Sequence, residues 1–73
     1  MKLSEHRRKK GLTQTELGQM LDVSQQQVAK YEAGTSIPSK TVIMKMMEAL
    51  ELSPNEVWEM FYGTDETSGS ERG

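Results

Sequence analysis

The sequence predicts an all-α fold of five short helices in a single domain. Apolar residues recur at the three- and four-residue spacing of amphipathic helices. Four serine or threonine residues stand where helix-capping residues are expected: Thr13, Ser24, Ser39 and Ser53. Because the chain has only 73 residues, it can build one small core, with little room for an enclosed active site.

The first helix is expected over residues 2–10. Leu3 and His6 share one side of it with Arg7 beside them, and Gly11 supplies the left-handed residue that ends it. No second histidine and no cysteine accompany His6, so we interpret it as a partly buried structural residue rather than a metal ligand.

The second helix is expected over residues 14–21. Thr13 and Glu16 form a capping box at its start, and the apolar residues outside them form a hydrophobic staple. Gly18 has no side chain, which suits a close crossing by the next helix. The pattern predicts three buried residues: Leu17, Met20 and Leu21.

The third helix, residues 25–33, follows after a joint of only two residues, Asp22 and Val23. Ser24 and Gln27 form a second capping box, and Gly34 ends the helix. Two helices joined so closely must cross steeply and leave the outer face of the second one exposed. This is the helix-turn-helix arrangement.

The exposed face of the third helix is polar and short, and it carries Gln25, Gln26, Ala29, Lys30 and Ala33. Glutamine can donate to and accept from an adenine edge together, and lysine can reach guanine acceptors, so this face matches the major groove of DNA. For an isolated helix, a merely solvated face is the better interpretation. The capped helix and tight joint before it favour DNA recognition instead.

The fourth helix, residues 40–50, begins after the Ser39 cap. Its apolar stripe is rich in methionine, and we interpret the stripe as core because thioethers fill irregular gaps in small cores. The residues of the stripe are Ile43, Met46, Met47 and Leu50.

The fifth helix begins with a third capping box, Ser53 and Glu56, with Pro54 at the first helical position. Three of the four aromatic residues of the chain are here, and apolar groups occupy more than one face. This excess predicts a homodimer contact across a two-fold axis; the alternative is that the aromatic residues only close the core. The predicted contact residues are Val57, Trp58, Phe61 and Tyr62.

The composition excludes several classes of function. With one histidine, no cysteine and no glycine-rich phosphate loop, the sequence offers no catalytic or metal-binding constellation, and we expect no enzyme activity, no cofactor and no small-molecule ligand. No apolar run is long enough to cross a membrane, which favours a cytoplasmic protein. Residues 1–62 are expected to form the domain, and residues 63–73 a disordered polar tail.

The charge is unevenly distributed, although the net charge is −2. Residues 1–45 hold eight Lys or Arg and four Asp or Glu, which gives +4; residues 46–73 hold one Arg and seven Asp or Glu, which gives −6. A basic half that faces phosphates while the acidic half points away is compatible with DNA binding.

Five motifs occur in register: GLTQ at 11–14, a V-S pair at 23–24, Y-E-x-G at 31–34, a P-S pair at 38–39 and S-P-x-E at 53–56. On these motifs, residues 3–61 resemble the Cro and repressor type of helix-turn-helix proteins, the lambda-repressor-like DNA-binding domains. The resemblance implies a five-helix domain that places its third helix in the major groove. It also implies a dimer on a near-palindromic operator, in a bacterial or phage setting.

The resemblance assigns roles to individual residues. It implies base reading by Gln25, Gln26, Ala29 and Lys30, with Gln25 paired to adenine and braced by Gln14. It implies contacts to the DNA backbone from a second set: Gln14, Ser24, Gln27, Thr35, Ser36 and Lys40. It also implies a structural ion pair between Arg7 and Glu32.

Three positions depart from the family pattern, one of them being His6, which stands where leucine is usual. Gly18 stands where alanine is usual, and Asp22 stands where glycine is usual, so the second helix should be less stable and the joint more strained. We predict a sequence-specific transcriptional regulator that binds double-stranded DNA, a repressor that occludes a promoter by binding its operator. The alternative is a protein-interaction module of the same fold, for example an antitoxin subunit that holds a partner protein; the glutamine-led face favours DNA.

Overall fold

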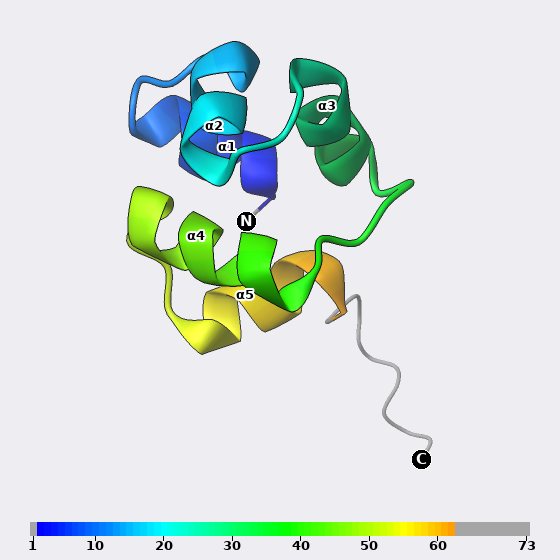
Figure 1. The fold of residues 1–73 in the computed structure, drawn as a ribbon. Coiled ribbons are helices and arrows are strands. Elements are labelled where there is room, and N and C mark those ends of the chain that lie inside the picture. Colours follow the sequence, from blue (N-terminus) through cyan, green and yellow to red (C-terminus); the bar gives the residue numbers. More distant parts are fainter. Residues whose placement is uncertain (1, 63–73) are drawn as a thin grey trace.

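The computed structural model describes residues 2–62, and this part of the chain consists of helices and the loops between them (Figure 1). The predicted five helices and all-α fold class are confirmed. The expected disordered tail, residues 63–73, lies outside the described residues. The helices are α1 (Leu3–Lys9), α2 (Gln14–Leu21), α3 (Gln25–Ala33), α4 (Lys40–Leu50) and α5 (Pro54–Phe61).

The predicted capping boxes form at the starts of α2 and α5. The Thr13 hydroxyl accepts a bond from the Glu16 amide at 3.0 Å, and the Glu16 carboxylate accepts one from the Thr13 amide at 2.9 Å. Ser53 and Glu56 make the same reciprocal pair at 3.2 and 2.8 Å. Each box satisfies two backbone N–H groups that a helix start otherwise leaves without partners, so each fixes the residue at which its helix begins.

The capping box predicted at α3 forms only in part. The Ser24 hydroxyl accepts a bond from the Gln27 amide at 3.1 Å, but the Gln27 side chain donates to the Ser36 hydroxyl at 3.0 Å. The prediction was wrong for the second half of the box because a glutamine side chain both donates and accepts, and here a loop hydroxyl lies within its reach. The bond fastens the loop between α3 and α4 to the start of α3.

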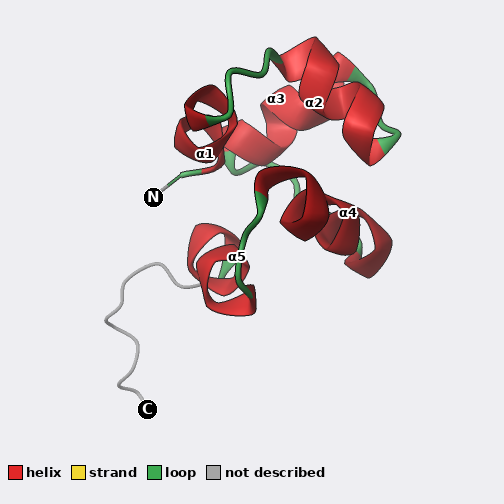
Figure 2. Cartoon of the chain, turned by 90° about the vertical axis from the view of Figure 1, so that its left-hand side faces the viewer, coloured by secondary structure: helices red, strands yellow, loops and turns green. Residues whose placement is uncertain are grey.

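The helix α2 lies at the centre of the fold, packed against α3 and α4, while α1 packs on α3 and α5 on α4. Figure 2 shows α1, α2 and α3 in one half of the molecule and α4 and α5 in the other. Nine buried apolar residues fill the space between them: Leu3, Leu17, Leu21, Val28, Tyr31, Met46, Leu50, Leu52 and Val57.

The expected burial of Met20 is wrong, since this side chain is 47% exposed. The buried stripe of α2 consists of Leu17, Gly18 and Leu21. At about 100° per residue, Met20 projects to one side of that stripe. Gly18, rather than Met20, therefore lies on the side of α2 that packs against the segment leading into α3.

Two of the departures from the family pattern meet at the joint between α2 and α3. Asp22 has φ 62° and ψ 41°, the left-handed conformation for which glycine is the easier residue. Gly18 lies directly under the joint, because a Cβ built on it would stand 2.7 Å from the Val23 carbonyl oxygen. The two positions together allow the backbone of the joint to lie close against α2.

We expect Gly18→Ala to destabilise the domain, although alanine is the better helix former. Helix propensity would add about 1 kcal/mol to the free energy of unfolding, but overpacking against backbone atoms costs about 1–3 kcal/mol. Denaturant unfolding measures the balance. Gln19→Ala is the matched control, because Gln19 is the exposed neighbour on the same helix. If Gly18→Ala were more stable than the parent, the joint would have to accommodate a methyl group without strain.

Candidate nucleic-acid interface

The outer face of α3 presents the side chains that the sequence assigns to base reading. Gln25, Gln26 and Lys30 are exposed, and Ala29 between them is half-buried. The inner face is fixed in the core by Val28 and Tyr31, of which Val28 is fully buried. The ring of Tyr31 also packs edge-on against Phe61 of α5, with centroids 6.5 Å apart. These core contacts set the rotation of α3 about its axis, so its polar face points outward.

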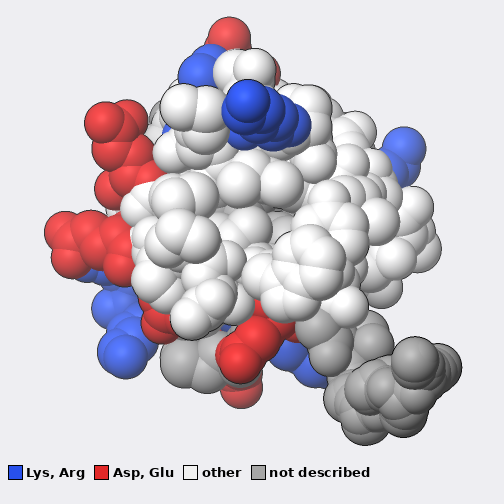
Figure 3. Space-filling view, turned by 90° about the horizontal axis from the view of Figure 1, so that it is seen from below, with Lys and Arg blue, Asp and Glu red and all other residues white. Residues whose placement is uncertain are grey.

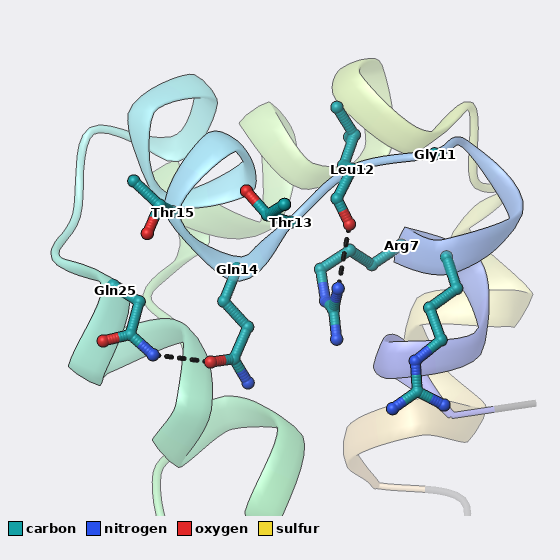
Figure 4. Close-up of a pocket in the computed structure, with 8 residues that line it drawn as sticks. Arg7, Gly11, Leu12, Thr13, Gln14, Thr15 and Gln25 are labelled. Atoms are coloured by element: carbon teal, nitrogen blue, oxygen red, sulfur yellow. Dashed lines mark hydrogen bonds between the residues drawn. The ribbon is translucent and has the colours of Figure 1, made fainter.

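The first residue of α2 and the first residue of α3 are joined at the surface. Gln25 donates its amide N–H to the side-chain oxygen of Gln14 at 2.6 Å, the contact drawn at the lower left of Figure 4. Both side chains line a shallow depression between α1, α2 and α3. The bond ties the first turn of α3 to α2, so Gln25 is oriented before any ligand arrives.

An ion pair beneath this depression links α1 to the end of α3. Arg7 Nε lies 2.5 Å from Glu32 Oε2, and the side chains of both residues are only 10% exposed. A second guanidinium nitrogen of Arg7 donates to the Leu12 carbonyl at 2.8 Å (Figure 4). One arginine therefore joins α1, the segment leading into α2, and α3. A charge-assisted group in this position fixes three elements together.

Glu32 also bonds the glutamine at the start of α2. Gln14 Nε2 donates to Glu32 Oε1 at 2.9 Å, and Arg7 Nη2 donates to the same oxygen at 3.4 Å. Burial raises the pKa of Glu32, but the hydrogen bonds from Arg7 and Gln14 and the nearby positive charge outweigh it and hold the pKa below its ordinary value. Glu32 is therefore a carboxylate at neutral pH.

The residues expected at the DNA backbone fall into two groups. Lys40 is exposed at the first position of α4, and Ser24 is exposed at the start of α3. The others have side-chain partners within the protein: Gln14 bonds Glu32 and Gln25, Gln27 of α3 bonds Ser36 of the loop, and Thr35 donates its hydroxyl to the Lys30 carbonyl at 3.3 Å. The bonds of Gln27 and Thr35 order the loop after α3 and keep it beside the exposed face.

The sequence analysis overlooked Arg8. This exposed residue lines the same depression as Gln14, Thr15 and Gln25, so a second guanidinium stands next to the end of the exposed α3 face. The signal in the sequence was the run of four basic residues at 7–10, of which only Arg7 was assigned a role. Arg8 therefore adds positive charge to the depression that Gln14 and Gln25 line.

The aromatic residues of α5 separate into core and surface. Trp58 and Tyr62 are 60% and 44% exposed, and their rings stack with centroids 4.7 Å apart. Phe61 is partly buried against the core. Val57 is only 4% exposed, so its assignment to an outer contact surface is wrong: it faces the core of its own protomer. The exposed aromatic surface at α5 thus consists of Trp58 and Tyr62, the residue that follows the helix.

The face formed by α4 and α5 is uncharged at its centre. Figure 3 views the molecule from this side, and both acidic and basic residues stand along its edge. The exposed apolar residues Met44, Trp58 and Tyr62 come from these two helices or the residue after them. Lys9 and Lys10 of α1 lie beside Glu51 and Glu56 at the edge of this side, and Lys10 pairs with Glu51 at 2.8 Å.

His6 and the carboxylate residues are the candidate metal ligands of residues 2–62. His6 is 8% exposed and packed in the interior, in keeping with a structural role. Within this range, no three His, Cys, Asp or Glu side chains come together as metal ligands. A search of the same residues for a helix long and apolar enough to span a membrane identifies none.

Comparison with known proteins places the chain in a family. The searches of curated proteins and of solved structures returned no match. The family model described as Helix-turn-helix matches residues 3–57, which covers all of α1 to α4 and the first part of α5. The match includes the capped helix pair, the residues of the Gln14–Gln25 bond and the Arg7–Glu32 ion pair. The chain therefore belongs to the Cro and repressor type of the helix-turn-helix family of DNA-binding regulatory domains.

Proposed function

We propose that this protein is a transcriptional repressor that reads a near-palindromic operator with α3 in the major groove. The observation that carries the proposal is the orientation of Gln25, which is exposed on α3 and held by Gln14 of α2. A braced glutamine offers a fixed donor and acceptor to a base edge, which a solvated glutamine does not. Gln26, Ala29 and Lys30 complete the base-reading face.

The backbone contacts of the proposed complex come from residues beside this face. Lys40, Ser24 and Thr35 are exposed on the elements next to α3, and Arg8 adds a guanidinium at its other end. Gln27 and Ser36 bond each other and so hold the loop in which Thr35 stands. Positive and polar groups on both sides of a recognition helix fix its register on the duplex.

A homodimer through α5 fits this function, because two copies of α3 would then read two half-sites related by a two-fold axis. The stacked Trp58 and Tyr62 supply the exposed apolar surface for the contact. Such a repressor would act in the cytoplasm of a bacterium, encoded by the host or by a phage. It would act by occluding a promoter.

Selection from random duplex DNA tests the proposed function. We expect the enriched sequences to share a motif with two-fold symmetry, since each protomer reads one half-site. The second candidate function is a protein-interaction module, which the exposed aromatic pair on α5 would favour. Absence of any enriched motif would favour that candidate over DNA recognition.

Lys40→Ala is expected to weaken binding to every DNA sequence by a similar factor. Loss of one phosphate contact should make the plot of log Kobs against log salt concentration shallower by about one unit. Lys9→Ala is the matched control, because Lys9 is an exposed lysine that lies beside the acidic residues Glu51 and Glu56. An unchanged slope for Lys40→Ala would exclude a phosphate contact.

Trp58→Ala is expected to shift the protein towards monomer in sedimentation equilibrium. Truncating a large exposed aromatic side chain removes apolar surface from the proposed contact, and aromatic residues often dominate such contacts. Met20 of α2 is 47% exposed and lies outside the proposed contact, so Met20→Ala is the control for loss of an exposed apolar group elsewhere. A parent protein that stays monomeric at high concentration would contradict the dimer.

A further inference from the structure

A series of hydrogen bonds between side chains runs from the buried Arg7–Glu32 ion pair to the base-reading surface. Arg7 donates to Glu32, Gln14 donates to Glu32 at 2.9 Å, and Gln25 donates to Gln14 at 2.6 Å. The first two residues are almost fully buried, and the last is exposed. These hydrogen bonds therefore connect the Glu32 carboxylate, which is too buried to touch DNA, to the Gln25 amide on the base-reading surface.

The chemistry of the four groups sets the direction of every bond. A carboxylate only accepts hydrogen bonds, so Gln14 must turn its NH₂ group towards Glu32 and its carbonyl oxygen towards Gln25. Gln25 must then turn its NH₂ group towards Gln14. An isolated glutamine amide can face either way at little cost, because its two ends have nearly the same shape. Here the carboxylate decides the orientation of both amides.

The geometry of Glu32 argues that this bond is more than a by-product of the ion pair. Its Oε2 lies 2.5 Å from Arg7 Nε, whereas its Oε1 accepts a bond from Gln14 at 2.9 Å and a longer one from Arg7 Nη2 at 3.4 Å. The shorter of the two bonds to Oε1 is therefore the one from Gln14. Because a carboxylate oxygen only accepts hydrogen bonds, it keeps Gln14 in one orientation.

The fixed orientation limits what Gln25 can recognise. One of its two N–H groups is bonded to Gln14, which leaves one donor and the carbonyl oxygen for a base edge. Adenine offers N7 as an acceptor and N6–H as a donor. The remaining N–H of Gln25 can donate to N7, and its carbonyl oxygen can accept from N6–H. Guanine offers two acceptors, N7 and O6, and only a glutamine with both N–H groups free could donate to both.

We propose that Glu32 is a positioning residue for base recognition: through Gln14 it fixes which way the Gln25 amide faces, and so makes Gln25 select adenine over guanine. The proposal rests on the proposed function, because it concerns the same α3 face on the same DNA. It assigns to Glu32 a role in specificity in addition to its role in the ion pair with Arg7.

Competition between two duplexes tests the proposal. One is the operator obtained by selection, and the other carries guanine in place of the adenine that Gln25 contacts; Kd for each is measured by fluorescence anisotropy. A bidentate contact gives the parent a preference of about tenfold or more. In Glu32→Gln, whose amide can face Gln14 with either end, we expect that preference to fall by at least about threefold.

Arg7→Gln is the matched control, because it breaks the same ion pair but leaves the carboxylate of Glu32 for Gln14. We expect this variant to be less stable and to keep the adenine preference. If Glu32→Gln alone does not fold, the double variant with Arg7→Gln removes both charges, so that no unpaired charge stays buried. It should show the same reduced preference.

A double-mutant comparison separates positioning from a general loss of structure. If Glu32 acts through Gln14, Glu32→Gln should have no further effect on the preference once Gln14→Ala is present. An unchanged preference in folded Glu32→Gln, or a further fall in the Gln14→Ala background, would overturn the proposal while the proposed function stands. A parent without any sequence preference would overturn both.

Discussion

Arg7→Ala is expected to remove about 3 kcal/mol from the free energy of unfolding, the largest loss that we predict for one substitution. Removing one partner of a buried ion pair leaves the other charge without compensation, which costs about 3–5 kcal/mol. The Glu32 carboxylate would keep only its bond from Gln14, and the Leu12 carbonyl would lose the guanidinium. Because a chain of this length has a total stability of about 4–11 kcal/mol, much of it would be lost.

The free energy of unfolding of Arg7→Ala is measured by urea titration, and two further variants serve as controls. Arg8 is exposed one position further along α1, so Arg8→Ala should change the stability by less than about 0.5 kcal/mol. Replacing the pair together, Arg7→Met with Glu32→Leu, removes both charges and should recover most of the lost stability. If Arg7→Ala were no less stable than Arg8→Ala, the ion pair would not hold α1 to α3.

Gln25→Ala is expected to weaken binding to the operator by about 1–3 kcal/mol, a factor of about 5 to 150, and to leave binding to random DNA nearly unchanged. The reason is that a base-edge contact carries sequence information, whereas contacts to phosphates do not. The folded state should persist, since Gln25 is exposed and its side chain makes one hydrogen bond within the described residues, to Gln14. Kd values on both kinds of duplex, at one salt concentration, provide the comparison.

Gln19→Ala is the control for this measurement. Gln19 is an exposed glutamine of α2 with no role in the proposed interface, so the variant should bind both duplexes as the parent does. An equal loss on operator and random DNA for Gln25→Ala would mean that this side chain contacts the backbone rather than a base.

Local signals in the sequence were enough to predict the helices. A capping residue and the side chain three positions later lie within one turn, so the boxes at Thr13 and Ser53 depend little on the rest of the fold. Gly34 likewise ends α3 with φ 81°, a conformation that its own lack of a side chain permits. The helix boundaries follow from such short-range chemistry.

The direction of individual side chains required the packed structure. Met20 and Val57 both belong to apolar patterns, yet the first is exposed and the second is buried, because the angle at which each helix meets its neighbours selects the inward residues. Gln27 bonds Ser36 rather than the start of its own helix because the loop after α3 returns to it. No pattern within one helix contains that information.

The contacts of the candidate site were only partly foreseeable. The pairing of Arg7 with Glu32 and the bracing of Gln25 by Gln14 were implied by resemblance to a family. The bond between Gln14 and Glu32, which are 18 positions apart, was not anticipated. It depends on how α1, α2 and α3 meet. Arg8 was overlooked because one residue in a basic run gives no sign of which way it points.

The most direct test of DNA reading by α3 is a comparison of parent and Gln25→Ala on every single-base variant of the selected operator. We expect the parent to discriminate at several base pairs of each half-site, and Gln25→Ala to lose that discrimination at one base pair per half-site while keeping it at the others. Base reading by this face of α3 would be contradicted if Gln25→Ala discriminated between bases as the parent does. It would also be contradicted if the variant lost discrimination equally at every position.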